Sequence, residues 1–228
     1  MSYMMRLNDK YKDMLDGIEA VIFDLDGSLC DSMWIWGQID IDFLGGRGIS
    51  VPKDLQKAIE GISALETAVY FKNRFGFEDS PEEILSIWVD MAYEKYRTSV
   101  KLKAGAKEFI YYLKDNGYKL AICSSNAHDL VETALRANDV LECFDAIISD
   151  KHVTYGKPNP ECYLKAAEAL GILPERCIAF EDIVKGIEAA HNAGMKACGV
   201  EDAYSEYQRE EKIKMAEYYI NDFTDLYS

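Results

Sequence analysis

The sequence predicts an α/β fold, in which a three-layer parallel sheet carries a bundle of helices inserted after its first strand. Strand-like apolar runs alternate with helix-like segments from residue 101 onward, which is typical of βαβ crossovers and a parallel sheet. Between residues 32 and 98, aromatic residues and helix formers are interleaved without strand-like alternation. A strand is expected at about 19–24, before that stretch, so the helices are expected to interrupt the sheet.

The first apolar run ends in two carboxylates, Asp24 and Asp26, with Gly27 directly after them. Two like charges at the end of a buried strand are costly unless a cation neutralises them, which indicates an oxygen-preferring metal such as Mg²⁺. Gly27 would let the chain turn sharply away from the strand. A calcium loop of the EF-hand type does not fit, because its glycine comes sixth in the pattern and Gly27 comes fourth. An ordinary strand with an acidic turn stays an alternative for this stretch alone.

Length and composition limit the classes of protein. The 228 residues suffice for one large domain or for a core domain with a smaller insert. The formal net charge of −15 argues against a sequence-independent grip on nucleic acid or on an anionic membrane, because both need a basic surface. The six cysteines show no C-x-x-C pair, which favours reduced thiols and a cytoplasmic location. Neither a signal peptide nor a membrane span is expected.

The first half of the chain is expected to be helical apart from one strand. Residues 3–16 place apolar side chains at helical spacing, so a short amphipathic helix is expected before the strand at 19–24. About four helices are expected within 32–98, where a capping box at 63–66 and the sequence at 79–83 mark two helix starts. The aromatic residues of this stretch are interpreted as core rather than as a platform for a ligand.

The second half alternates regularly. Helices are expected at 105–116, 127–137, 159–170 and 184–193. Strands are expected at 118–123, 146–149, 177–180, 195–200 and 218–220. The predicted domains are an α/β core formed by 1–31 with 99–228, and a helical cap at 32–98.

Polar residues follow four of the predicted strands, where ligands gather in an open parallel sheet. They are Asp24 and Asp26, Ser124-Ser125-Asn126, Lys157 in a Gly-Lys-Pro turn, and Glu181-Asp182. Each has an ordinary alternative when taken alone: the serines could cap a helix, the lysine could be a solvated loop residue, and the acids could begin a helix. A P-loop is excluded, because Lys151 stands where its first glycine is required. Together these residues predict one site for an anionic ligand.

These segments resemble the four motifs of the haloacid dehalogenase superfamily, in order and in spacing. The matching segments are Asp24 to Ser28, Ser124, Lys157 in Gly-Lys-Pro-Asn-Pro, and Glu181-Asp182 followed by 186–195. The insert at 32–98 is similar to the cap of the subgroup that contains phosphatases and beta-phosphoglucomutases. The resemblance departs from the pattern at Ser28, where threonine is commoner and the hydroxyl is kept. It implies a Rossmann-like core with an inserted helical cap.

The resemblance also implies a chemistry, that of an Mg²⁺-dependent phosphatase of a small phosphorylated metabolite such as a sugar phosphate. Asp24 would attack phosphorus to form an aspartyl-phosphate, and Asp26 would protonate the leaving oxygen and then activate water. The implied metal ligands are Asp24, the backbone carbonyl of Asp26, Asp182, and Glu181 either as a ligand or behind the ligands. The implied phosphate-binding residues are Ser124, Ser125 and Lys157.

The choice between a phosphatase and a mutase rests on the cap. The resembling mutases bind a second phosphate through the Lys and Arg of a Lys-Gly-x-Ser-Arg segment. The matching stretch at 60–64 lacks both of these cationic residues. A phosphatase is therefore favoured, and a beta-phosphoglucomutase-type mutase stays the alternative, because Arg47, Lys72 and Arg74 could substitute for the missing cations. Asp26 favours phosphate esters, since the resembling dehalogenases and phosphonate-cleaving members lack an acid there. A non-catalytic phosphate-binding protein on the same fold is a less favoured alternative.

The cap is expected to close over the core, with hinges at 30–33 and 99–103. The residues expected to face the leaving group are Gly61, Trp34 and Trp36. Among the histidines, His128 is expected near the site, whereas His152 and His191 are expected to be structural or exposed. The chain is expected to act as a monomer or a weak dimer, without a nucleic-acid or membrane partner.

Overall fold

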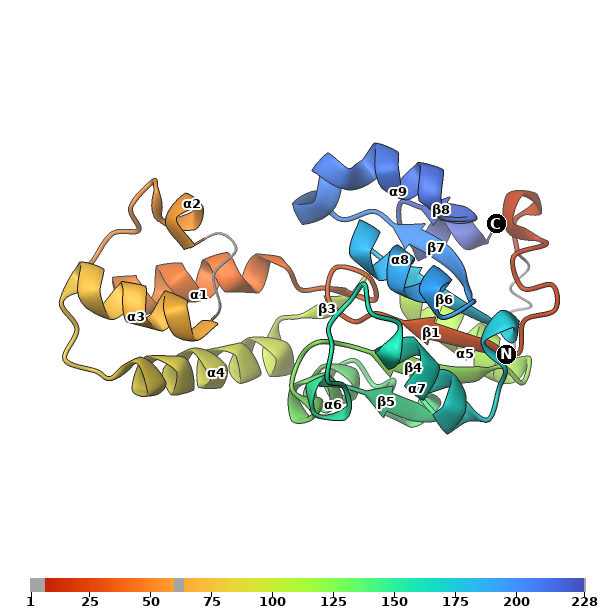
Figure 1. Cartoon of the computed structure of the whole chain (residues 1–228), viewed down its shortest axis with the longest axis horizontal. Helices are drawn as coiled ribbons and strands as arrows, with labels where there is room; N and C mark the ends of the chain where they lie inside the picture. The colour runs from red at the N-terminus through yellow and green to blue at the C-terminus, as the bar shows by residue number, and fades with distance from the viewer. Residues whose placement is uncertain (1–6, 60–63, 228) are drawn as a thin grey trace. The chain divides into compact units, whose positions relative to one another are not determined.

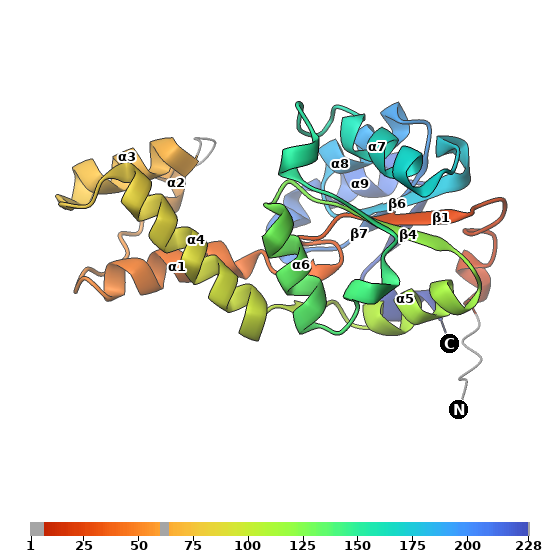
Figure 2. The ribbon, with the colours of Figure 1, turned by 90° about the horizontal axis from the view of Figure 1, so that it is seen from below.

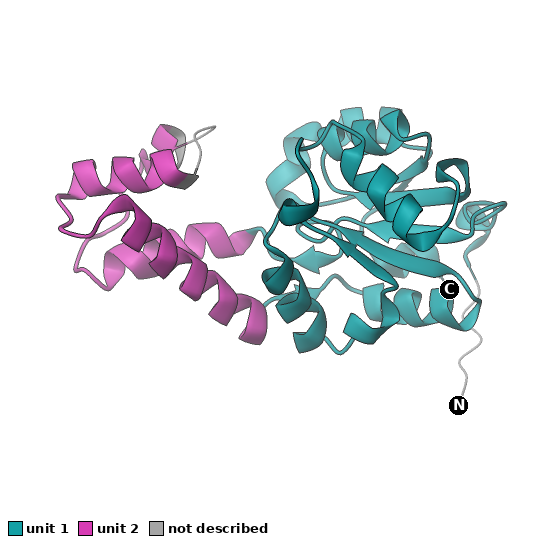
Figure 3. Ribbon diagram, turned by 60° about the horizontal axis from the view of Figure 1, so that its bottom comes forward, with its two compact units in different colours: residues 1–33, 100–228 teal, residues 34–99 magenta. Residues whose placement is uncertain are grey.

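The computed structural model describes residues 7–59 and 64–227. The chain divides into two compact units (Figure 3). One, which we call the core unit, comprises residues 1–33 and 100–228, and the other, the helical unit, comprises residues 34–99. None of the described helices is both long and apolar enough to cross a membrane.

The core unit is built on a sheet of six parallel strands in the order β5-β4-β1-β6-β7-β8 (Figure 1). The strands are β1 (Ala20–Phe23), β4 (Lys119–Cys123), β5 (Ala146–Ile148), β6 (Cys177–Glu181), β7 (Lys196–Val200) and β8 (Tyr218–Ile220). At the carboxyl end of β1, Phe23 is paired with Ile122 on one side and with Phe180 on the other. The predicted α/β fold with a parallel sheet is therefore confirmed.

Helices cover both faces of this sheet. They are α5 (Ala106–Asp115), α6 (His128–Ala137), α7 (Glu161–Leu170), α8 (Val184–Asn192) and α9 (Arg209–Met215). Buried residues of α7 and α8 pack on one face against β1, β4, β6 and β7, and α5 lies on the opposite face (Figure 2). The core unit also contains short 3-10 turns: η1 (Asp9–Tyr11), η2 (Leu141–Cys143), η3 (Asp150–His152), η4 (Pro174–Arg176), η5 (Ala203–Gln208) and η6 (Phe223–Leu226).

A cluster of buried phenylalanines packs beneath the ends of β1 and β6. Phe23 stacks on Phe180 with ring centroids 5.1 Å apart, and Phe109 of α5 contacts both rings. Phe223 of η6 stacks on Phe180 at 5.5 Å. Because Phe23 directly precedes Asp24 and Phe180 directly precedes Glu181, this cluster fixes the two strand ends that carry acidic residues.

A second pair of strands lies next to the chain crossings between the units. The strands β2 (Cys30–Asp31) and β3 (Lys101–Leu102) are antiparallel and belong to the core unit. They were not predicted, because two-residue strands leave no periodicity in the sequence. They fall within the stretches proposed as hinges, and the closing motion itself stays a prediction.

The helical unit contains α1 (Trp34–Gly45), α2 (Leu55–Ile59), α3 (Ala64–Phe75) and α4 (Pro81–Thr98). Its core is aromatic: Phe71 contacts Trp88 edge to face at 4.9 Å, and Phe43 contacts Trp88 at 5.5 Å. The predicted start of α4 is present as a capping box, in which Ser80 and Glu83 exchange hydrogen bonds of 2.7 and 3.1 Å. The other predicted capping box begins at Ser63, outside the described residues.

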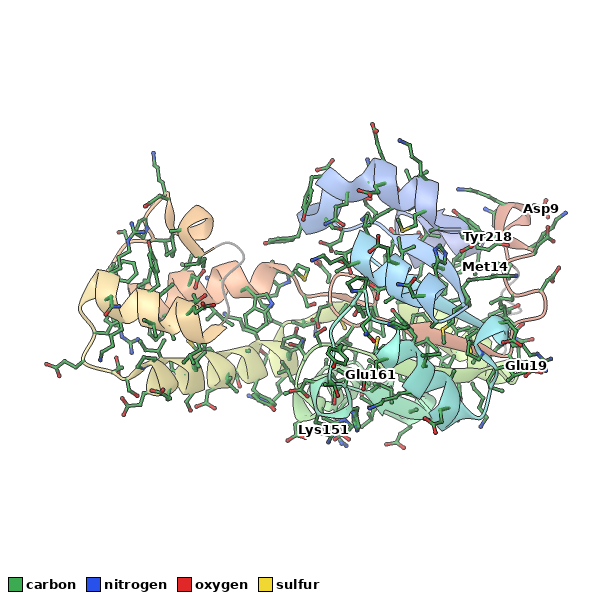
Figure 4. All side chains as sticks on the ribbon, viewed as in Figure 1. Asp9, Met14, Glu19, Lys151, Glu161 and Tyr218 are labelled. Carbon is green, nitrogen blue, oxygen red and sulfur yellow. The ribbon has the colours of Figure 1, made fainter. Side chains whose placement is uncertain are left out.

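The helix predicted at 3–16 is wrong for the residues that the structure describes. From Leu7 onward the segment forms the 3-10 turn η1 and further turns, and Tyr11 and Met14 are buried. Figure 4 labels Met14. The Tyr11 hydroxyl donates to the Tyr219 carbonyl at 2.9 Å, and Leu7 forms a bridge with Tyr227. These contacts with the C-terminal part of the core unit override a short amphipathic pattern, which is too weak to hold a helix by itself.

Replacement of Phe109 by alanine should lower the free energy of unfolding by about 3–5 kcal/mol, because it leaves a cavity among fully buried rings. Urea denaturation followed by circular dichroism measures this loss. The control is Tyr111→Ala on the same helix, where the side chain is 43% exposed and about 1 kcal/mol or less should be lost. Similar losses for the two variants would contradict the role given to the phenylalanine cluster.

Candidate active site

Asp24 stands at the carboxyl end of β1 and is held by its backbone. All four residues of β1 are fully buried, so the strand places Asp24 with only 9% of its surface exposed. The Asp24 amide donates to the Phe180 carbonyl at 3.0 Å, and the Ser28 hydroxyl donates to the same oxygen at 3.0 Å. The acidic turn after β1 is thereby fastened to β6 at both of its ends.

Gly27 makes room for a second carboxylate. It has a φ of +79°, which favours glycine. A Cβ at this position would also stand 2.8 Å from Cγ of Asp182, too close for any side chain. The glycine of the predicted turn therefore allows the turn after β1 to approach Asp182 closely.

The Asp26 carboxylate is only partly buried and is held on both oxygens. Oδ1 accepts a hydrogen bond from the Ser32 hydroxyl at 2.6 Å, and Oδ2 accepts one from the Asn126 side-chain amide at 2.6 Å. This arrangement fixes the carboxylate while keeping it within reach of solvent. Sequence reasoning did not single out Ser32, because its contact depends on the shape of the turn and no spacing rule marks it.

Lys157 links Asp24 to Glu181. Its ammonium lies 2.6 Å from Asp24 Oδ1 and 2.5 Å from Glu181 Oε1, and its side chain is about one-tenth exposed. Burial alone would lower the pKa of Lys157, but the carboxylates of Asp24 and Glu181 hold it well above the usual value for lysine. The lysine is therefore positively charged at neutral pH and directed at the candidate nucleophile.

The loop that carries Lys157 is held by Glu161, which is labelled in Figure 4. Glu161 Oε2 accepts hydrogen bonds from the amides of Thr154 and Tyr155 at 2.8 and 3.0 Å, and Oε1 pairs with Lys165 at 3.0 Å. An acidic residue in the first turn of a helix such as α7 is common, because it interacts favourably with the helix dipole. The sequence therefore does not indicate that Glu161 also contacts the loop.

Glu181 is almost fully buried, and its carboxylate is engaged by neighbours. Besides Lys157, the Tyr163 hydroxyl donates to Glu181 Oε1. Gly186, in the first turn of α8, faces the same carboxylate, and a Cβ there would overlap it. Sequence reasoning left open whether Glu181 is a metal ligand or lies behind the ligands. These contacts favour a role in which Glu181 positions Lys157.

Three buried carboxylates gather at this edge of the sheet. Asp24, Glu181 and Asp182 each offer an oxygen within 4.8 Å of the others, so the donor set suits a hard divalent cation. Burial, reinforced by the charge of Asp24, raises the pKa of Asp182 to about 8. Burial likewise raises the pKa of Glu181 to about 7, although Lys157 acts in the opposite direction. Three carboxyl groups beside one ammonium leave negative charge that a cation would neutralise.

The two predicted serines follow β4, the neighbour of β1. Ser124 is buried, its hydroxyl accepts from the Asn126 amide at 3.1 Å, and its own amide donates to the Ile148 carbonyl at 2.9 Å. Ser125 is exposed at the end of the same strand. The hydroxyls therefore lie at the carboxyl edge of the sheet, where Asn126 also reaches Asp26.

The remaining predicted residues are placed as follows. His128 stacks edge to face on His152 with ring centroids 5.4 Å apart, and its Nε2 lies 3.4 Å from Glu132. His191 is partly exposed and pairs with Glu217 at 3.1 Å.

The candidate leaving-group residues belong to the helical unit. Trp34 begins α1 and is half-buried, and Trp36 is 44% exposed. Gly61 lies outside the described residues. Their contact with a leaving group stays a prediction.

The comparison with known families agrees with the fold. Residues 21–200 match the family model of haloacid dehalogenase-like hydrolases. The chain belongs to this family, as its sequence motifs predicted.

Known relatives match over most of their length. Hexitol phosphatase B of Escherichia coli strain K12 is 26% identical over 211 residues, which cover 92% of this chain and 94% of the relative. Beta-phosphoglucomutase of Bacillus subtilis strain 168 is 30% identical over 198 residues, covering 80% and 83%. The crystal structure of a hydrolase of this family from Deinococcus radiodurans, with bound phosphate and sodium, has a TM-score of 0.70 and 26% identity and covers 92% of this chain and 93% of that one.

The free energy of unfolding of the metal-free protein should fall between pH 6.5 and 8.5. An acid whose pKa is raised by folding contributes stability that is complete below its unfolded pKa near 4 and is lost as the pH rises through its folded pKa. For Glu181 and Asp182 those folded values are about 7 and about 8. A divalent cation binds the ionised carboxylates, so Mg²⁺ should raise the melting temperature more at pH 8.5 than at pH 6.5.

Thermal melts with and without Mg²⁺ at both pH values measure this competition. Asp182→Asn is the control, because it removes one titrating carboxylate and should reduce both the pH dependence and the response to Mg²⁺. A wild-type melting temperature that rises equally with Mg²⁺ at the two pH values would count against competition between protons and metal at these carboxylates.

Proposed function

We propose that this protein is an Mg²⁺-dependent phosphatase that hydrolyses a small phosphorylated carbohydrate through an aspartyl-phosphate. The observation that carries the proposal is the arrangement of the two aspartates of the first turn. Asp24 is buried against the Lys157 ammonium at 2.6 Å, whereas Asp26 is partly exposed and held on both oxygens. This difference supports Asp24 as the nucleophile and Asp26 as the proton carrier.

The general class of enzyme follows from the family and its members. The predicted class, a phosphoric monoester hydrolase of the haloacid dehalogenase type, is confirmed by the family match and by phosphatase relatives that cover most of the chain. The hexitol phosphatase supports a sugar phosphate or sugar-alcohol phosphate as the substrate, in agreement with the prediction of a small phosphorylated metabolite.

In the first step, a carboxylate oxygen of Asp24 attacks phosphorus and the bond to the sugar oxygen breaks. Protonated Asp26 gives its proton to that oxygen, which then leaves as an alcohol rather than as an alkoxide. Ser32 and Asn126 donate to Asp26 and hold the carboxyl group in place at 2.6 Å each. Fixing the acid before the reaction reduces the entropy lost on reaching the transition state.

In the second step, Asp26 takes a proton from water as the water attacks the aspartyl-phosphate, which restores Asp24 and releases inorganic phosphate. Lys157 and Ser124, with Ser125, hold the phosphoryl oxygens and stabilise the charge that develops on them. Glu181 keeps Lys157 directed at Asp24, since Glu181 is itself held by Tyr163. Dividing a slow hydrolysis into these two steps lowers each barrier.

The residues that would hold Mg²⁺ are Asp24, Asp182 and the backbone carbonyl of Asp26, with Glu181 adjoining them. When bound, Mg²⁺ would supply positive charge that offsets the repulsion between the anionic nucleophile and the anionic substrate. Asp24 and Asp182 are mostly buried and share one cluster of oxygens, which suits this function.

A mutase needs cationic residues to bind a second phosphate. The three candidates for this, Arg47, Lys72 and Arg74, each have a partner within the helical unit. Arg47 pairs with Asp79 at 3.1 Å, and Arg74 pairs with Asp54 at 2.8 Å. The Lys72 ammonium donates to the Asp79 carbonyl at 2.7 Å. Since these partners would have to be given up before a second phosphate could bind, their contacts favour hydrolysis over transfer.

Substitution of Asp24 by asparagine should reduce phosphate release by roughly 10³-fold or more, because the amide cannot act as the nucleophile. The measurement is ³¹P NMR of the protein with Mg²⁺ and a panel of hexose and hexitol phosphates, including beta-glucose 1-phosphate with a trace of the bisphosphate. Asp16→Asn changes an exposed carboxylate that precedes the amino end of β1, at the opposite end of this strand from Asp24, and it should retain the wild-type rate. Phosphate that migrates between sugar positions without release would identify a mutase, and binding without turnover would identify a phosphate-binding protein.

Asp26→Asn should separate the two steps when the substrate is p-nitrophenyl phosphate. Its leaving group is acidic and needs no proton, so the first step should proceed, whereas the aspartyl-phosphate should persist for lack of a base. Stopped-flow absorbance should then show a burst of about one nitrophenolate per active site followed by a slow phase. A steady slow release without a burst would mean that Asp26 is not the base of the second step.

A further inference from the structure

A buried lysine lies behind the acidic cluster. Lys212 is on α9 and is fully buried, which is costly for an ammonium group. Ser205, in the turn η5 that leads into α9, is also buried. Neither residue belongs to the four motifs, and neither has a function in the mechanism above.

These two side chains form a chain of hydrogen bonds that ends on Asp182. The Lys212 ammonium donates to the Ser205 hydroxyl oxygen at 2.9 Å and to the Val200 carbonyl at 3.2 Å. The Ser205 hydroxyl lies 2.7 Å from the Asp182 carbonyl, and the Asp202 carbonyl lies farther from it, at 3.4 Å. Because an ammonium can only donate, Ser205 accepts from Lys212 and is left to donate its proton toward Asp182.

Lys212 also lies near the Asp182 carboxylate, although the chain of hydrogen bonds itself ends on the Asp182 backbone carbonyl. Burial lowers the pKa of Lys212, whereas the carboxylates of Glu201 and Asp182 act to raise it, so Lys212 and Asp182 are within electrostatic reach of each other. The nearest carboxylate oxygen, Glu201 Oε2, lies 3.8 Å from the ammonium and makes no hydrogen bond of its own within the described residues. The hydrogen bonds of the ammonium therefore go to two neutral acceptors, the Ser205 hydroxyl and the Val200 carbonyl, and Glu201 is a longer ion-pair partner.

We propose that Ser205 and Lys212 are positioning residues that orient the Asp182 peptide, and with it the Asp182 side chain, for cation binding. This inference rests on the proposed function, in which Asp182 is a ligand of Mg²⁺. It extends the cation site beyond the strand ends to a hydrogen-bonded chain from the C-terminal part of the core unit. Residues that orient metal ligands in this way typically change metal affinity by about 10-fold to 100-fold when they are removed.

The test is the dissociation constant of Mg²⁺, measured by calorimetry on the full chain without substrate. Ser205→Ala should weaken Mg²⁺ binding by roughly 10-fold, whereas Ser205→Thr, which keeps the hydroxyl, should bind as the wild type does. Lys212→Met should weaken binding to a similar extent. Because both residues act through one chain of bonds, the double variant should bind about as weakly as the worse single variant.

A matched control separates positioning from general stability. Ser149→Ala also removes a fully buried hydroxyl from the core unit, and it should leave the Mg²⁺ dissociation constant unchanged. The activation constant for Mg²⁺ should follow the dissociation constant in Ser205→Ala, while kcat at saturating Mg²⁺ should stay close to the wild-type value. This split between metal affinity and turnover is not expected if the hydroxyl only stabilises the fold.

Each contrary result has one meaning. Wild-type Mg²⁺ affinity in Ser205→Ala, or equal weakening in Ser149→Ala, would overturn the positioning function and leave the proposed phosphatase intact. A wild-type protein that releases phosphate without binding Mg²⁺ would overturn the proposed metal dependence and this inference with it. Because Ser205→Ala changes a single hydroxyl, the test does not depend on whether Lys212→Met folds.

Discussion

The structure depends on the burial of three carboxylates beside one lysine. Asp24, Glu181 and Asp182 come from two neighbouring strands, and only Lys157 among the residues described around them supplies a direct positive charge. Such a cluster would be strongly unfavourable if its members were free to ionise together. The phenylalanine cluster, the fastened turn after β1 and the hydrogen bonds to Glu181 hold the carboxylates in place. The same repulsion between the carboxylates favours the binding of an external cation.

Much of this arrangement could be predicted from the sequence, because it follows from strand ends. In a parallel sheet all carboxyl ends meet at one edge, so residues that directly follow strands must be neighbours in space. Asp24, Asp26, Ser124, Lys157 and the acidic pair after β6 were found in this way. The strands themselves were found because buried parallel strands are continuous apolar runs bounded by turn residues.

The residues that sequence reasoning missed act through contacts between segments. Ser32 reaches Asp26 because of the shape of a turn, and Ser205 reaches Asp182 because η5 contacts the segment that follows β6. Glu161 looks like an ordinary helix start, and the contacts that define its function are made to a loop. The helix predicted for the N-terminal segment was wrong for a related reason, since tertiary contacts such as that of Tyr11 outweighed a weak helical pattern. The periodicity of apolar residues shows which face of a helix or strand is buried. It does not show contacts between side chains of separate turns and loops.

The fit between Gly27 and Asp182 has a consequence for how the family's sequences can vary. The volume that a side chain at position 27 would need is already occupied by a carboxylate far along the chain. The size of the residue at position 27 in the turn after β1 and the position of the acid at 182 after β6 therefore constrain each other, although no single motif contains both. A lineage that acquired alanine at position 27 would have to withdraw or shorten its acid at position 182. Covariation between these two positions should accordingly be almost absent within active members and should appear where the metal site has been lost.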